Sequence, residues 1–174
     1  LKMDINRLLS DFTNLCQAIK ILGELSPRAL DTVSSLGERL AVRILAAAVE
    51  SAGFPAKAVE ASQIIITDDC FQNAAPDMKL TTARCEKVLA PLLNEGIVPI
   101  VTGFMGATPD GVITTLGRGG SDYSASILAV GLRATEVWIW TDVTGVMSAD
   151  PRIIPQAKTI PYLSYKEVSE MAFY

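Results

Sequence analysis

The chain has 174 residues, of which 49% are hydrophobic and 20% charged, and its net charge at neutral pH is −4. This length accommodates one domain with a substantial core, and the composition is that of a soluble globular protein. The negative charge and the lack of a basic cluster argue against a nucleic-acid partner, and no apolar run is long enough to span a membrane.

The cysteine and histidine counts restrict the chemistry further. Cys16, Cys70 and Cys85 are widely spaced, which predicts neither a disulfide framework nor a metal site and favours a reducing cytoplasm. The sequence contains no histidine, so Ser-His and Cys-His catalysis and His-ligated zinc are excluded. The chain begins at Leu1 without methionine and stops at Tyr174, and we expect it to be a piece of a longer polypeptide.

Helices are predicted first, in chain order. Apolar residues recur three or four apart from residue 4 to about residue 25. Ser26 and Pro27 predict the start of the next helix, which runs to about residue 52, and a break within residues 34–37 stays open. Further helices are expected over residues 81–94 and 121–132, and another one from about Ser164.

Apolar segments between these helices predict strands. They cover residues 56–61, 64–67, 97–104 and 136–142, with a hairpin over residues 106–116 that turns at 109–111. Pro99 argues against a central position for the 97–104 strand. Helices that alternate with continuous apolar strands indicate an α/β fold with a mostly parallel sheet covered on both faces. Such sheets bind ligands beyond the carboxyl ends of their strands.

Residues 114–124, with the sequence TTLGRGGSDYS, are the most informative segment. Glycines before a helix can direct backbone N–H groups and the helix dipole at an anion, and Arg118 adds a planar fork for a carboxylate or phosphate. Asp122 would repel an anion, which suggests that it manages protons or cationic groups. The alternative is a helix cap formed by Ser121 or Asp122, but a cap alone would not need the preceding Arg-Gly-Gly.

Glu38 lies on the apolar face of its expected helix. Burial of a carboxylate there is costly unless a positive group meets it, and a substrate ammonium could be that group. The alternative is a capping box in which Ser35 and Glu38 satisfy each other locally. The spacing alone leaves both possibilities open.

Residues 141–152 could form a nucleotide site. Asp142 and Asp150 could hold a metal-bound nucleotide or its ribose, and Arg152 could meet phosphate. The alternative is a surface loop of ordinary turn residues, and the expected strand before the segment is what favours the binding site.

Together these segments resemble the catalytic domain of aspartokinases, in the amino acid kinase family. The resemblance starts at about Leu30 and keeps the order of the family's motifs. It is carried by SLGE at 35–38, Phe104 with Gly106, residues 114–124, WTDVTGV at 140–146 and DPR at 150–152. The Arg-Gly-Gly-Ser-Asp-Tyr run paired with the Thr-Asp-Val loop is the specific part, whereas the Gly-Glu element alone would be weak.

The resemblance implies a three-layer α/β/α sandwich with a mostly parallel central sheet. Its substrate side would span residues 1 to about 134, and its nucleotide side residues 135–174. It implies transfer of the γ-phosphoryl group of ATP, with Mg²⁺, to the side-chain carboxylate of L-aspartate. The product, 4-phospho-L-aspartate, leads to lysine, threonine and methionine, and the full-length protein would be a cytoplasmic homo-oligomer.

The resemblance also implies a role for each motif residue. Arg118 and Asp122 would be the catalytic residues: Arg118 would bind a substrate carboxylate, and Asp122 would organise the catalytic site. Glu38 would bind the substrate ammonium. The other implied residues are Phe104, Gly119, Gly120 and Ser121 on the substrate side, and Thr141, Asp142, Met147, Asp150 and Arg152 on the nucleotide side. Met147 stands where the family commonly has tyrosine.

Two family segments, Lys-Phe-Gly-Gly and Gly-Ala-Lys-Val-Leu-His-Pro, have no counterpart in these 174 residues. We therefore expect the fragment to be inactive alone while the full protein is a kinase. A glutamate or acetylglutamate kinase is the nearest alternative, and a non-catalytic ligand-binding fragment is another.

Overall fold

The computed structural model describes residues 1–142 and 144–173, so Val143 of the expected nucleotide loop and Tyr174 lie outside the described residues. The chain divides into two compact units, Leu1–Val137 and Trp138–Tyr174, and each is described by itself.

The first unit begins with three helices whose ends follow local chemistry. Helix α1 spans Lys2–Leu22, and Gly23 ends it with a left-handed backbone at φ 68°. Helix α2 spans Pro27–Ser34, where the Ser26 hydroxyl caps the helix by accepting the Ala29 N–H, as the Ser-Pro pair predicts. Helix α3 covers Leu36–Ser51. The break left open within residues 34–37 is therefore real and falls at Ser35.

Four short strands form two separate pairs in this unit. Strands β1 (Ala56–Val59) and β2 (Val98–Val101) pair in parallel, and β3 (Met105–Ala107) and β4 (Ile113–Thr115) form the expected antiparallel hairpin. β2 pairs only with β1 in the described chain, which agrees with an edge position for Pro99. A short 3-10 turn, Ala61–Gln63, follows β1.

Two strand predictions need correction. Residues 64–67 form no strand and are joined to their neighbours only by single bridges, Ile66 to Ala107 and Thr67 to Pro76. The 97–104 segment pairs only over its first half and is partly exposed, with Val98 43% exposed. Whether such a short apolar run forms a strand depends on a neighbouring strand that can pair with it, and the run itself does not show whether that neighbour is available.

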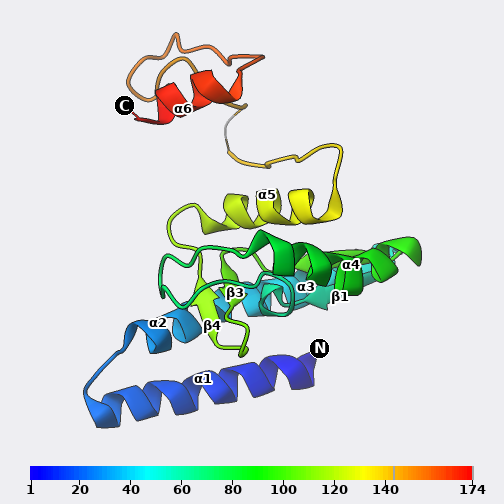
Figure 1. Ribbon diagram of the computed structural model, residues 1–174, viewed down its shortest axis with the longest axis vertical. Coiled ribbons are helices and arrows are strands. Elements are labelled where there is room, and N and C mark those ends of the chain that lie inside the picture. Colours follow the sequence, from blue (N-terminus) through cyan, green and yellow to red (C-terminus); the bar gives the residue numbers. More distant parts are fainter. Residues whose placement is uncertain (143, 174) are drawn as a thin grey trace. The chain divides into compact units, whose positions relative to one another are not determined.

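Helices cover the strands on both sides. Helix α3 packs on β1 and β2 with α1 behind it, while α4 (Met78–Asn94) packs on β2 and against α5 (Gly120–Leu132). Figure 1 shows α5 on one side of the strands and α1 on the other. The buried side chains form two clusters, which comprise Ala61, Ile65, Met105, Leu116 and Ile127 in one, and Val59, Ile64, Cys85 and Leu89 in the other.

The strand expected over residues 136–142 is not formed. The segment belongs to neither sheet of the described chain, and the boundary between the two units falls inside it. Its apolar side chains are exposed, with Trp138 at 71% and Trp140 at 86%. An extended segment becomes a strand only when a neighbour pairs with its backbone, and neither sheet here includes it.

The second unit contains one regular element in its described part, helix α6 (Tyr165–Phe173). Ser164 and Glu167 form a capping box at its start: the Ser164 N–H donates to Glu167 Oε2 at 2.8 Å, and the Glu167 N–H donates to Ser164 Oγ at 3.3 Å. This agrees with the helix expected from about Ser164. Among the helices described, none is long and apolar enough to cross a bilayer.

Candidate active site

The glycine-rich segment forms a tight bend before helix α5. Gly117 and Gly119 both adopt left-handed backbone conformations, at φ 79° and 72°, which glycine accepts without strain. Gly119 is the N-cap residue of α5, and no side chain forms a capping hydrogen bond at this end of the helix. The alternative in which Ser121 or Asp122 caps this helix is therefore wrong.

The bend leaves hydrogen-bond donors free at the start of α5. The N–H groups of Gly120 and Tyr123 are used by Gly117 O and Gly119 O, whereas those of Ser121 and Asp122 have no acceptor among the described residues. Arg118 is exposed, and its side chain contacts no acid in the described chain. Free N–H groups at the positive end of a helix, beside a free guanidinium, suit an anionic ligand.

The Phe104 turn is held directly against this bend. Phe104 O accepts the Leu116 N–H at 2.9 Å, and the Phe104 N–H donates to Ser124 Oγ at 2.8 Å. The Ser124 hydroxyl in turn donates to Gly120 O at 2.6 Å. Two short bonds thus join the Phe104 turn to the 114–124 segment, and the third holds the Ser124 hydroxyl in place within that segment.

Gly120 is required by close packing at this junction. A Cβ placed on Gly120 would lie 2.9 Å from Cδ2 of Phe104 and 3.3 Å from Cβ of Leu116. Phe104 itself adopts a left-handed backbone at φ 66°, which is uncommon for a residue with a side chain. The absence of a side chain at Gly120 therefore lets the Phe104 turn approach the helix start.

Glu38 has no partner in the described chain. It lies in the first turn of α3 and is half-buried, and its carboxylate forms no hydrogen bond or ion pair with residues 1–142 or 144–173. The capping-box alternative is wrong, because the buried Ser35 hydroxyl donates to Thr32 O at 2.8 Å and does not cap α3. The Glu38 carboxylate is thus available to a cationic ligand.

Sequence reasoning missed Asp31, which ties α2 to β4. Its side chain is 1% exposed and accepts hydrogen bonds from the Thr115 N–H and hydroxyl. Asp31 lies before the motif residues, and its hydrogen-bond partners are far along the chain. No local sequence pattern therefore indicated that it has a role at this site. Through this contact, the helix that leads into Glu38 is attached to the strand that leads into Arg118.

The second unit has a surface pocket with a volume of about 590 Å³. It is lined by Asp142, Gly145, Met147, Ala149, Asp150, Pro151 and Arg152. Met147 is held by a bridge to Thr159, and the Thr141 hydroxyl donates to Asp142 Oδ1 at 3.1 Å. The structure thus places four of the five predicted nucleotide-side residues around one pocket, while Thr141 contacts one of them.

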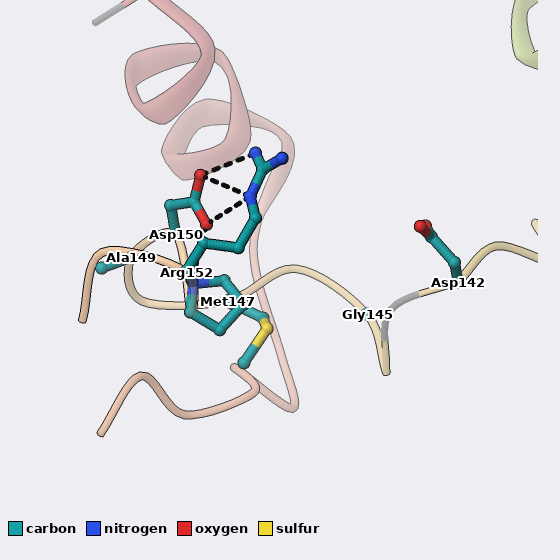
Figure 2. Close-up of a pocket in the computed structure, with 7 residues that line it drawn as sticks. Asp142, Gly145, Met147, Ala149, Asp150 and Arg152 are labelled. Carbon is teal, nitrogen blue, oxygen red and sulfur yellow. Dashed lines mark hydrogen bonds and ion pairs between the residues drawn. The ribbon is translucent and has the colours of Figure 1, made fainter. Parts of the chain in front are cut away.

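Within this pocket, Asp150 and Arg152 bind each other. The Arg152 guanidinium donates through Nη2 to Asp150 Oδ2 at 2.8 Å and through Nε to both carboxylate oxygens, and the Arg152 N–H donates to Oδ1. Figure 2 shows this pair on one side of the pocket and Asp142 apart from it. These hydrogen bonds lower the pKa of Asp150 and raise the pKa of Arg152. A phosphate that binds Arg152 would have to compete with Asp150.

Metal-ligating side chains do not gather in the described chain, which has no group of three or more Cys, Asp or Glu residues that could hold an ion. A Mg²⁺ ion does not require such a cluster of side chains, because it keeps several waters and is commonly held by substrate phosphates with one or two carboxylates. Asp142, which is exposed at the pocket, is a carboxylate of that kind.

The sandwich of helices and strands, with a glycine bend that exposes N–H groups before α5, is an α/β domain suited to binding a small anionic ligand. Residues 4–174 match the family model described as the amino acid kinase family. The chain belongs to that family.

Curated relatives and solved structures place the chain beside aspartokinases. It is 39% identical over 159 residues to an aspartokinase of Schizosaccharomyces pombe and 37% identical over 172 residues to the lysine-sensitive aspartokinase 3 of Escherichia coli K12. These alignments cover 90% and 99% of this chain but 30% and 38% of the relatives, so the chain spans about a third of their length.

A solved structure agrees closely with this chain. The E. coli aspartokinase III in complex with aspartate and ADP superposes with a TM-score of 0.92 at 36% identity, over 99% of this chain and 38% of that one. The α/β sandwich predicted from the sequence is therefore confirmed.

Proposed function

We propose that this chain is part of the catalytic domain of an aspartate kinase. The full-length protein transfers the γ-phosphoryl group of ATP to the side-chain carboxylate of L-aspartate and releases ADP and 4-phospho-L-aspartate. The observation that carries the proposal is the bend at residues 117–122, which has free N–H groups and a free guanidinium and whose flanking residues are hydrogen-bonded to the Phe104 turn. Similarity to aspartokinases over nearly the whole chain supports it.

On the substrate side, each proposed contact matches the charge that it would meet. Arg118 binds a carboxylate of aspartate through its planar fork, and Glu38 binds the ammonium group. Gly119, Gly120 and Ser121 supply the backbone of the anion-binding bend, and the Phe104 ring forms a wall of the substrate pocket. Free donors at Arg118 and a free carboxylate at Glu38 support these roles.

Asp122 has the least obvious role because its exposed carboxylate follows an anion-binding bend. We propose that it organises the catalytic site by orienting a cationic side chain toward the transferred group. It lies in the first turn of α5, directly after the bend, where a negative side chain interacts favourably with the helix dipole.

On the nucleotide side, we propose that Thr141, Asp142, Met147, Asp150 and Arg152 line the ATP site. The pocket of the second unit supports this assignment. The missing 136–142 strand weakens the sequence argument for it, because that strand was what favoured a binding loop over a surface loop. Mg²⁺ would arrive with the ATP phosphates, with Asp142 the carboxylate best placed to assist.

The chemistry needs positioning more than it needs a strong base. The side-chain carboxylate of aspartate is ionised at neutral pH, so its oxygen attacks the γ-phosphorus without proton removal. A bond forms between these atoms while the bond from the γ-phosphorus to the bridging oxygen of ADP breaks. Because two anions must approach each other, cations and oriented N–H groups supply most of the catalysis. The lack of histidine does not hinder such a reaction.

We further propose that the full-length protein acts in the cytoplasm as a homo-oligomer and begins the synthesis of lysine, threonine and methionine. The similarity to aspartokinases, one of which is described as lysine-sensitive, supports the biosynthetic part of this proposal. Gel filtration with light scattering would test the oligomer, and a monomer at micromolar concentration would contradict it.

A substrate comparison tests the central proposal. The full-length protein is supplied with ATP, Mg²⁺ and either aspartate, glutamate or N-acetylglutamate, and ADP release is followed with hydroxylamine trapping of the acyl phosphate. We expect turnover with aspartate alone. Turnover with glutamate or N-acetylglutamate instead would assign the chain to another kinase of the family, and aspartate binding without turnover would indicate a non-catalytic protein.

A further inference from the structure

Asp31 holds three donors from two distant segments. Its Oδ2 atom accepts the N–H groups of Gln72 and Thr115, each at 2.9 Å, and its Oδ1 atom accepts the Thr115 hydroxyl at 2.8 Å. The side chain is 1% exposed, so these bonds replace its contacts with water completely. None of the motifs identified in the sequence includes this residue.

The two segments that Asp31 holds both lead to the anion-binding bend. Thr115 ends β4 just before the bend, and its carbonyl accepts the Ala74 N–H at 2.9 Å. Gln72 adopts a left-handed backbone at φ 70°, and a Cβ on Gly117 would lie 3.0 Å from Gln72 O. The turn at residues 72–74 therefore lies against the bend. Asp31 is hydrogen-bonded both to this turn, at Gln72, and to the strand end before the bend, at Thr115.

Asp31 also belongs to the helix that precedes Glu38. Helix α2 packs on β4, and only Ser35 separates α2 from α3, whose first turn carries Glu38. A shift of the Asp31 carboxylate would therefore move the Arg118 bend relative to the Glu38 turn. These are the two ends between which an amino acid substrate would be held.

We propose that Asp31 is a positioning residue for the substrate site. It acts by geometry and not by charge, because it sets the spacing between the bend at residues 117–122 and the start of α3. The kinetic part of this inference rests on the proposed aspartate kinase function, whereas the structural part does not.

Two substitutions separate geometry from charge. Asp31→Asn removes the charge but keeps the bonds, since the amide oxygen can accept both N–H groups and the amide NH₂ can donate to the Thr115 hydroxyl. Asp31→Glu keeps the charge but moves the carboxylate by one methylene at a position that is only 1% exposed. Leu89→Ala is the control, because Leu89 is 1% exposed in the other core cluster.

Kinetics in the full-length protein give the first readout. We expect Asp31→Asn to keep kcat/KM for aspartate within about threefold and Asp31→Glu to lower it by roughly tenfold or more, with KM for ATP nearly unchanged. Leu89→Ala should lower the melting temperature but leave kcat/KM within about twofold. The reverse order, with Asn impaired and Glu active, would overturn the proposal in favour of an electrostatic role. Equal losses in Asp31→Glu and Leu89→Ala would overturn it in favour of a purely structural role.

Hydrogen–deuterium exchange gives a second readout that needs no substrate. Amides of residues 115–123 should exchange faster in Asp31→Glu than in the wild type or Asp31→Asn, and unchanged exchange would refute the positioning role. This holds even if the wild type fails to phosphorylate aspartate, an outcome that would reject the proposed function alone. Should Asp31→Glu not fold, Thr115→Val removes one of the three bonds with little change in volume, and the same exchange pattern is expected.

Discussion

Gly119 and Gly96 offer a matched test of whether the bend before α5 binds substrate. Both residues have a backbone φ of 72°, and an added Cβ would meet no atom within 4 Å at either position. Gly96 follows α4, whereas Gly119 lies between Arg118 and the free N–H groups of α5. The two sites thus share their conformation and differ in what surrounds them.

The cost of alanine should be equal at the two positions. An L-residue in the left-handed region is destabilised by about 1–2 kcal/mol, and the lower backbone entropy of unfolded alanine offsets about 0.4–1 kcal/mol of this. We therefore expect each substitution to reduce stability by roughly 1 kcal/mol. Gly119→Ala should also lower kcat/KM for aspartate by roughly tenfold or more, because the bend must shift to relieve the strain.

The assay combines thermal unfolding with aspartate kinetics on both variants of the full-length protein. Similar losses in melting temperature with a kinetic defect only in Gly119→Ala are expected. If Gly119→Ala and Gly96→Ala have the same kcat/KM, the bend does not contact the substrate and the proposed site is wrong. If their melting temperatures differ widely, the backbone argument fails.

Three further substitutions, one of them with a matched control, test single side chains. Arg118→Lys should raise KM for aspartate about tenfold without a change in melting temperature, because an ammonium cannot replace the bidentate fork, and an unchanged KM would exclude substrate contact. Glu38→Gln should raise the same KM while Glu50→Gln, at an exposed position on the same helix, should not. Arg152 lowers the pKa of Asp150 in the folded protein. The pair therefore contributes its full stabilisation at a pH above the pKa that Asp150 has in the unfolded chain, and this contribution is lost as the pH falls through the lower pKa of the folded state. Arg152→Ala should return the Asp150 titration, followed by NMR, toward 3.8, and an unmoved midpoint would contradict the pairing.

Features that depend on near neighbours in the sequence were predictable. The start of α2 follows from Ser26 and Pro27, and the hairpin of β3 and β4 follows from a turn sequence between two short apolar runs. Strands over residues 64–67 and 136–142 were wrong because strand formation depends on a partner elsewhere in the chain. The same reason makes the helices more reliable, since their backbone hydrogen bonds are internal.

The candidate site divides in the same way, and the division has a physical cause. Groups that receive a ligand must keep their hydrogen-bonding capacity free, and Arg118 and Asp122 are accordingly exposed. Because such residues have few partners within the protein, the local motif is the main signal that identifies them. Groups that hold the site together must have partners within the protein, and those of Asp31 and Ser124 come from other segments of the chain. A sequence motif can therefore nominate the ligand-binding residues of such a site, while its supporting residues become visible only once the fold brings the distant segments together.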